Sequence, residues 1–149
     1  MGTYRDLLLN STSFLLIDWP DREVPDTLAR HGFSVVSQDG PGPADYNAYR
    51  ASAVTVQVSP AGRAPDRVDI VYGHRPLDEL PGIIEQARSL NARAVWLQSG
   101  QNGLGARDPR GCWMAPQDAI RARQMVEAAE LEFVQSPYLP DAVRAMMHP

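Results

Sequence analysis

The sequence has very little cysteine, no long apolar run and no excess of positive charge. Cys112 is the one cysteine among 149 residues, so an internal disulfide and a thiolate metal cluster are both excluded. No apolar stretch approaches the ~20 residues of a membrane-spanning helix. The first residues also lack the basic, apolar and small-residue order of a signal peptide. These absences predict a protein of the reducing cytoplasm that does not contact a membrane.

The charge balance narrows the possible ligands. The formal net charge is −4, with 44% apolar and 21% charged residues, which is ordinary for a globular protein. A nucleic-acid-binding protein would normally show a basic face, so we expect no nucleic-acid partner. A phosphorylated small molecule stays possible, because backbone N–H groups and one or two arginines can hold phosphate in an acidic protein. The length predicts a single domain over residues 1–149.

Short apolar runs alternate with longer amphipathic ones along the chain. Strands are expected over residues 14–17, 33–36, 53–58, 68–72, 94–97 and 131–134. Helices are expected over 24–29, 77–90 and 117–130, with a shorter one over 141–147, and Gly32 suits the position that follows the first helix. The run 14–17 is continuously apolar, as in a strand covered on both faces. The repetition predicts an α/β fold, with a doubly wound parallel sheet of about five or six strands and helices on both faces.

Four loops follow the strands of this predicted sheet. In such sheets, ligands bind outside the carboxyl ends of the strands, at the point where the strand order reverses. This rule selects the loops 18–22, 37–43, 73–76 and 98–105 as the ligand side. The candidate ligand-binding residues within them are Asp18, Trp19, Pro20, Arg22, Ser37, Gln38, Gly73, His74, Arg75, Pro76, Gln98 and Gly100.

Three segments within these elements resemble one family. Residues 68–81 read Val-Asp-Ile-Val-Tyr-Gly-His-Arg-Pro-Leu-Asp-Glu-Leu-Pro, a strand, an Arg-Pro turn and a helix. Residues 91–100 read Asn-Ala-Arg-Ala-Val-Trp-Leu-Gln-Ser-Gly, and residues 128–134 read Ala-Ala-Glu-Leu-Glu-Phe-Val. Together they resemble the small CoA-binding proteins with a Rossmann-like fold, which are similar to the CoA-binding domain of succinyl-CoA synthetase and acyl-CoA synthetases.

The resemblance implies coenzyme A, or an acyl-CoA, as the ligand. The diphosphate would lie near residues 18–22 and the adenine towards 37–41, while the pantetheine arm would pass 73–75 and 98–100. In the larger relatives the catalytic parts lie on additional domains, and 149 residues leave no room for them. The resemblance therefore implies a ligand-binding protein without catalysis of its own.

The first ligand loop departs from the family pattern. The family has a Gly-x-Ser-type loop there, whereas this chain has Asp18-Trp19-Pro20-Asp21-Arg22. The usual Asn-Pro turn after the second strand is replaced by Ser37-Gln38-Asp39-Gly40-Pro41. One alternative is therefore that this protein binds a nucleotide other than CoA. Another is a Rossmann-like interaction or regulatory domain that has lost the ligand. A dinucleotide-dependent enzyme is disfavoured, because no Gly-x-Gly-x-x-Gly follows the first strand.

The individual side chains have ordinary structural explanations beside the functional ones. Arg75 can bind a phosphate or carboxylate, or it can pair with an acidic residue at the start of its own helix. Trp96 lies inside an apolar run, which favours core packing, whereas Gln98 stands at the carboxyl end of that strand. His74 has no nucleophile placed beside it by the sequence, and Cys112 has no placed histidine. We therefore expect no catalytic residue and no metal site, and a homodimer as the simplest assembly.

Overall fold

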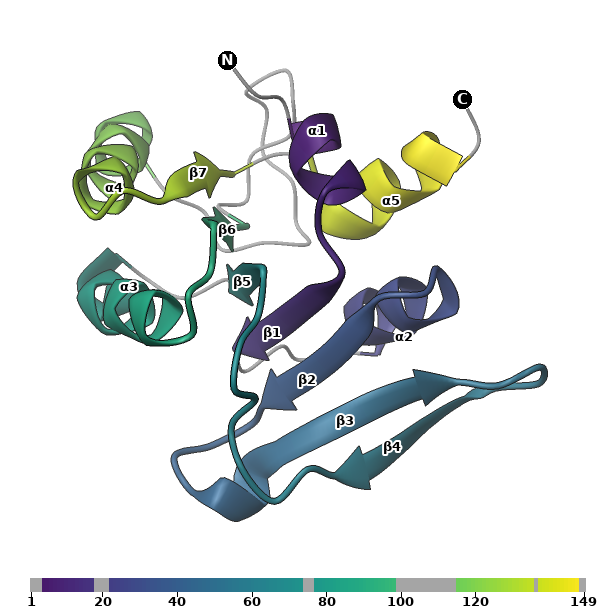
Figure 1. The fold of residues 1–149 in the computed structure, drawn as a ribbon. Helices are drawn as coiled ribbons and strands as arrows, with labels where there is room; N and C mark the ends of the chain where they lie inside the picture. Colours follow the sequence, from purple (N-terminus) through teal and green to yellow (C-terminus); the bar gives the residue numbers. More distant parts are fainter. Residues whose placement is uncertain (1–3, 18–21, 74–76, 99–114, 136, 148–149) are drawn as a thin grey trace.

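The computed structural model describes residues 4–17, 22–73, 77–98, 115–135 and 137–147. A sheet of seven strands forms its centre (Figure 1), in the order β4-β3-β2-β1-β5-β6-β7. The strands are β1 (Ser13–Ile17), β2 (Ser34–Gln38), β3 (Tyr46–Ala51), β4 (Val56–Pro60), β5 (Ile70–Gly73), β6 (Ala94–Leu97) and β7 (Glu132–Val134). β2, β1, β5, β6 and β7 run parallel to one another, while β3 is antiparallel to both β2 and β4.

Helices cover both faces of this sheet (Figure 1). They are α1 (Tyr4–Leu9), α2 (Glu23–Arg30), α3 (Leu80–Ser89), α4 (Pro116–Ala128) and α5 (Leu139–Met147), with single 3₁₀ turns at η1 (Pro43–Asp45) and η2 (Leu77–Glu79). α1, α2 and α5 supply residues to one core, and α3 and α4 supply residues to the other. The doubly wound α/β class predicted from the alternating pattern is therefore confirmed.

The two cores follow from the alternation of side chains along each buried strand. Phe14 and Leu16 of β1 pack with the α2 side, whereas Leu15 and Ile17 pack with the α3 side. All four are at most 9% exposed, which explains why this run is apolar at every position. Trp96 is fully buried in the first core, as its place in an apolar run predicted.

The strand expected over residues 53–58 overlaps the edge strand β4 only at residues 56–58, and the expectation of a single strand here is wrong. The chain instead forms a hairpin of β3 and β4, in which Tyr49 lies opposite Val58. Ser52 holds the turn, since its hydroxyl donates to the Thr55 carbonyl at 3.0 Å. Val56 is the one buried residue of β4, so no continuous apolar run marks the hairpin in the sequence. The sheet consequently has seven strands, and its two outermost strands on this side are not parallel.

Two local features complete the comparison with the sequence. Gly32 has φ +90°, a left-handed conformation that glycine adopts without steric cost, so its predicted place after α2 is confirmed. The helix α1 was not expected. It has only six residues, of which Leu7 and Leu8 are buried, and a helix that short depends on tertiary packing. Within the described ranges, no helix has the length and apolar character needed to cross a membrane.

The strand order places the reversal point between β1 and β5. From β1 the chain moves to β2 on one side, and later returns to β5 on the other side. Ile17 at the end of β1 is aligned with both Gln38 of β2 and Gly73 of β5. Gly73 in turn is aligned with Leu97 of β6. The carboxyl ends of four parallel strands therefore form one row, which is called the carboxyl edge below.

Candidate functional site

Several predicted ligand residues lie side by side at the carboxyl edge. Gln38 is the last residue of β2, and Gly73 is the last residue of β5 instead of part of a loop. Gln98 directly follows β6, and its backbone N–H donates to the Gly73 carbonyl at 2.8 Å. Asp18, Trp19, Pro20, His74, Arg75, Pro76 and Gly100 lie outside the described residues, as does Cys112.

A hollow of about 400 Å³ opens between the ends of β1 and β2 and the beginning of α3. Its wall includes a pair of glutamine amides, because Gln86 Nε2 donates to Gln38 Oε1 at 2.7 Å. Its described lining residues are Ile17, Gln38, Gly40, Pro41, Glu79, Gly82, Ile83 and Gln86. Ile17, Gly82 and Ile83 make part of this wall apolar, and the amide pair gives it hydrogen-bonding capacity. Clefts of this kind and size suit a small organic ligand.

At two positions beside the hollow, neither the backbone conformation nor the packing of neighbouring atoms requires glycine. Gly82 lies inside α3 without a positive φ, and a Cβ added there would meet no atom within 4 Å. Glycine at such a position costs a helix roughly 1 kcal/mol relative to alanine. A Cβ on Gly73 would meet Ile17 and Ile83 at 3.9 Å, which is ordinary contact. Both positions therefore leave free a space that a side chain could fill, next to the hollow.

Ser37 and Arg22 are engaged in contacts within the protein. Ser37 is buried, and its hydroxyl donates to Asp39 Oδ2 at 2.9 Å, where the Asn47 amide also donates at 2.7 Å. Arg22 bonds to Asp26 at 2.9 Å and to the Val56 carbonyl at 3.1 Å. Its guanidinium also lies 5.4 Å from the centre of the Tyr49 ring. Arg22 thus holds α2 against the hairpin, and a ligand would have to compete for it.

Gln98 is fully buried, unlike the other amides at this edge. The Tyr72 hydroxyl donates to its Oε1 at 3.4 Å. Its Nε2 has no hydrogen-bond partner among the described residues, and the same is true of Trp96 Nε1. Tyr72 and Trp96 contact edge to face, with ring centres 6.4 Å apart. The end of β6 therefore combines an aromatic pair with unpaired donors.

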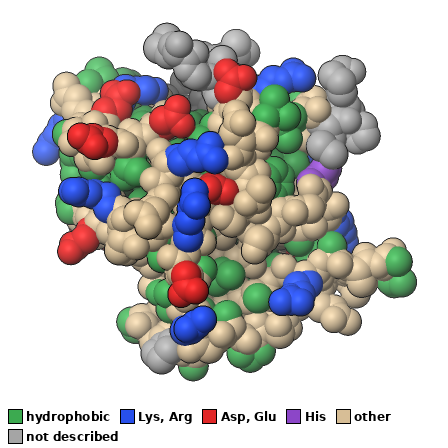
Figure 2. Space-filling model, in the orientation of Figure 1, with side chains coloured by type: hydrophobic (Ala, Val, Ile, Leu, Met, Phe, Trp, Pro, Cys, Tyr) green, Lys and Arg blue, Asp and Glu red, His purple; other side chains and the backbone are tan. Residues whose placement is uncertain are grey.

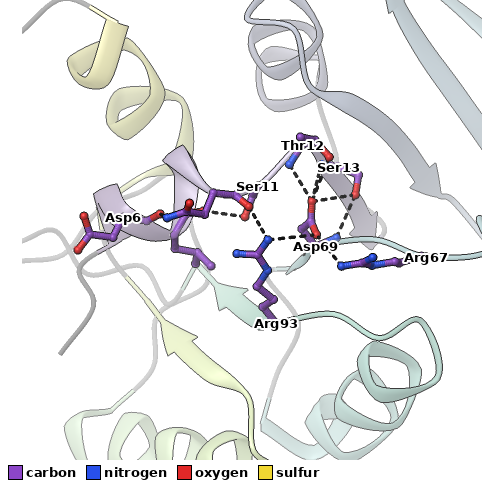
Figure 3. Close-up of polar contacts among 9 residues, drawn as sticks. Asp6, Ser11, Thr12, Ser13, Arg67, Asp69 and Arg93 are labelled. Atoms are coloured by element: carbon purple, nitrogen blue, oxygen red, sulfur yellow. Dashed lines mark hydrogen bonds and ion pairs between the residues drawn. The ribbon is translucent and has the colours of Figure 1, made fainter.

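The opposite end of the same strands, called the amino edge below, is organised around Asp69 (Figure 3). Asp69 precedes β5, and its side chain is 8% exposed. Its Oδ2 accepts hydrogen bonds from the backbone N–H groups of Thr12 at 2.7 Å and Ser13 at 3.3 Å, and from the Thr12 hydroxyl at 3.2 Å. Arg67 and Arg93 lie 3.8 and 4.0 Å from its Oδ1.

These contacts decide the ionisation of Asp69. Burial raises the pKa of this carboxyl group, but the hydrogen bonds from Thr12 and Ser13 and the charge of Arg93 outweigh it. The pKa therefore lies below the ordinary value of 3.8, and Asp69 is ionised at neutral pH. Since Thr12 directly precedes β1 and Ser13 is its first residue, the carboxylate ties β1 to β5.

The distribution of charge over the surface is mixed. Figure 2 shows arginine and acidic side chains interspersed on one face of the molecule, without a large area of one sign. Among the described residues, no group of three or more His, Cys, Asp and Glu side chains is placed to hold a metal ion. The described lining of the hollow contains one carboxylate, Glu79, and no serine, cysteine or histidine.

The residues that sequence reasoning missed at this site are those of α3 and its entry. Glu79, Gly82 and Gln86 were assigned to a helix without a role, although they line the hollow. One sequence signal was available, because a glycine inside an amphipathic helix often has a packing or functional reason.

The doubly wound sheet places this protein in the class of Rossmann-like α/β domains, in which ligands bind at the carboxyl ends of the parallel strands. Within that class, residues 20–136 match the model of the CoA binding domain family. The match covers more than half of the chain, so this protein belongs to the CoA binding domain family. The resemblance seen in the sequence is confirmed.

A solved structure has the same fold. It is described as the structure of cell-free ID.343 from Thermus thermophilus, and it is 16% identical to this chain, with a TM-score of 0.56 over 96% of each chain. No protein of curated function matches the sequence.

Proposed function

We propose that this protein binds coenzyme A, or an acyl-CoA, at the carboxyl edge and does not catalyse a reaction on it. The hollow with its two unoccupied glycine positions is the observation that carries the proposal. A helix that keeps Gly82 at a cost of roughly 1 kcal/mol fits a site whose space is needed by a ligand. Family membership supplies the class of that ligand.

The adenine is proposed to bind in the hollow. The bonded pair of Gln38 and Gln86 stands in its wall. A glutamine amide offers the donor and acceptor that match N7 and N6 of adenine, and the apolar wall at Ile17 and Ile83 suits the face of the base. The arm of the ligand then passes Gly73 towards Gln98, which are joined by a backbone hydrogen bond.

Absence of catalysis is proposed from the chemistry of the described lining. Acyl transfer needs a nucleophile with a base beside it, whereas the wall of the hollow offers amides, apolar groups and Glu79. Acetyl-CoA incubated with the protein should therefore release free thiol no faster than acetyl-CoA in buffer. A faster release that depends on protein concentration would contradict this part of the proposal.

Thermal-shift titrations with CoA, acetyl-CoA, NAD and ATP, followed by calorimetry, test the binding. Ligand at 100 times its dissociation constant adds about 2.7 kcal/mol to the free energy of unfolding. In a protein of this size that raises the Tm by roughly 5–10 °C. A shift with CoA and acetyl-CoA but not ATP is expected. No shift with any of them at millimolar concentration would overturn the proposal and favour an interaction domain.

A further inference from the structure

A second hollow lies at the amino edge, at the opposite ends of the strands from the proposed CoA site. Its volume is about 260 Å³. Its described lining residues are Asn10, Thr12, Ser13, Arg67, Asp69 and Arg93. Every one of these side chains carries a polar or charged group, so the hollow suits a polar ligand.

Two arginines converge on this hollow without a hydrogen bond to Asp69. The terminal nitrogens of Arg67 and Arg93 lie 3.8 and 4.0 Å from Asp69 Oδ1, which is longer than a hydrogen bond. Figure 3 shows the two guanidiniums reaching Asp69 from different directions. Their side chains are 65% and 44% exposed, so both are accessible to a molecule from solvent.

Most N–H donors of the two guanidiniums are unused within the described part of the chain. Arg93 donates to the Asn10 carbonyl at 2.5 Å, whereas Arg67 has its ion pair with Asp69 and no hydrogen bond to a described residue. A guanidinium presents its donors as a planar fork that matches the oxygens of phosphate and carboxylate groups. The arginines therefore have donors to spare for an added oxyanion.

The charges around the hollow do not balance. Asp69 compensates one of the two arginines, which leaves one positive charge in a protein whose formal net charge is −4. The neighbouring pair of Arg63 and Asp66 is neutral in sum, and the Asp6 side chain points away from the two guanidiniums in Figure 3. An anion between the guanidiniums would offset their mutual repulsion.

We propose that this hollow binds a phosphoryl group, held between the guanidiniums of Arg67 and Arg93. The oxygens of a phosphate point in several directions, so they can accept from two guanidiniums that approach from different sides. A carboxylate has two oxygens in one plane, and a single guanidinium can bind both. The site lies apart from the carboxyl edge, so the inference goes beyond the proposed function and does not depend on it.

Thermal denaturation in inorganic phosphate tests the site, with sodium chloride added to keep the ionic strength constant, because salt screens exposed charges. The Tm of the wild-type protein should rise with phosphate and saturate. At ten times the dissociation constant the rise should be roughly 3–6 °C. Arg67→Gln and Arg93→Gln should each bind phosphate roughly tenfold more weakly, because each loses charge-assisted hydrogen bonds.

The matched control is Arg63→Gln. Arg63 is also an exposed arginine with a carboxylate at 3.8 Å, but it does not line the hollow, so its removal should leave phosphate binding unchanged. Arg67→Gln should keep the Tm of the phosphate-free protein, since the Arg67 side chain is exposed and makes only a long ion pair. A loss of phosphate binding in this variant is therefore separate from unfolding.

Two further probes define the ligand. Glycerol 3-phosphate should protect as well as phosphate if the natural ligand is a phosphomonoester, whereas protection by inorganic phosphate alone would assign the free ion. Acetate, with a planar carboxylate, should protect much less than either.

Three results would overturn the inference. The first is a wild-type Tm that rises no more in phosphate than in chloride. The second is an equal rise in wild type and in both Arg67→Gln and Arg93→Gln, which would place the phosphate elsewhere on the protein. The third is equal protection by acetate, which would exclude selection of a phosphoryl group.

Discussion

At the amino edge of the sheet, the Asp69 carboxylate accepts hydrogen bonds from Thr12 and Ser13, whereas at the carboxyl edge Gln98 Nε2 has no described partner. Both side chains are nearly or fully buried, and they flank neighbouring strands of the same sheet, Asp69 before β5 and Gln98 after β6. The Asp69 carboxylate therefore has its hydrogen-bond partners within the protein, whereas the Gln98 side chain keeps a donor that no described residue uses.

The difference between the two edges separates the stability of the sheet from the binding of CoA. Thr12, Ser13 and Asp69 are the residues from which β1 and β5 start, so hydrogen bonds among them hold the central strands in register. The carboxyl edge has the opposite character, with glycines that leave space and an amide with spare capacity. We therefore expect substitution of Asp69 at the amino edge to change the free energy of unfolding, and substitutions at the carboxyl edge to change the affinity for CoA.

The largest effect is expected for Asp69→Ala. It leaves the N–H groups of Thr12 and Ser13 without the carboxylate that accepts from them, which should lower the free energy of unfolding by about 1–3 kcal/mol. Urea denaturation measures this value. Asp66→Ala is the matched control, because Asp66 is 88% exposed and its pair with Arg63 spans 3.8 Å, so its effect should stay within about 0.5 kcal/mol. Equal effects of the two variants would contradict the role given to Asp69.

The next effect is the loss of CoA affinity in Gly82→Leu. The new side chain enters the open space beside the hollow, so CoA should bind at least about tenfold more weakly, as measured by calorimetry. The helix should not suffer, because leucine is a better helix former than glycine. Gly82→Ala is the control, expected to raise stability by about 0.5–1 kcal/mol with a smaller loss of affinity. Unchanged affinity in Gly82→Leu would place the ligand elsewhere.

A smaller effect is expected for Gly73→Ala. The added methyl group contacts Ile17 and Ile83 at ordinary distance, so the ligand-free protein should be as stable as wild type, or more stable by about 0.4–1 kcal/mol. The same methyl group lies beside Ile17 and Ile83 of the hollow's wall, and CoA should bind a few-fold more weakly. Thermal denaturation without CoA measures the stability of the ligand-free protein, and the shift in Tm on adding CoA measures the change in affinity. A clear loss of stability without ligand would mean that Gly73 serves the sheet and not the site.

The smallest effect is the pH dependence of the Asp69 contribution. The pKa of this group is lowered by folding, so its stabilising contribution is complete above the unfolded value near 3.8 and is lost as the pH falls through the lower folded value. The stability difference between wild type and Asp69→Asn should therefore be constant near neutral pH and shrink only in acid. Urea denaturation at pH 7, 5 and 3.5 measures it, and a difference that grows in acid would reverse the sign argued here.

Much of the fold could be predicted because its central strands are buried on both faces. The continuous run at β1 and the Val-Trp-Leu of β6 are apolar at every position, and this pattern is visible without knowledge of neighbours. The hairpin of β3 and β4 was misplaced for the opposite reason, because most of its residues are exposed or half-buried. The position of this hairpin depends on the pairing of β3 with β2. That pairing leaves no periodic pattern of apolar residues within the hairpin itself.

The candidate site divides in the same way. Gln38, Gly73 and Gln98 were found from the rule that ligands lie at the carboxyl ends of parallel strands. Gly82 and Gln86 were missed, because they reach the hollow only when α3 packs beside the end of β2. The hydrogen bond from Arg22 to the Val56 carbonyl could not be predicted from the sequence either, since 34 positions separate the two residues.

The sequence by itself determined the α/β class, the buried strands, the end of α2 at Gly32 and the resemblance to CoA-binding proteins, because each depends on a short run of residues. Tertiary structure alone decided which polar groups are paired. Asp69 finds its donors 56 and 57 positions away, while Gln98 finds one partner 26 positions away and no described partner for its Nε2. The cost of burying a polar group depends on its neighbours in space, and the fold chooses those neighbours.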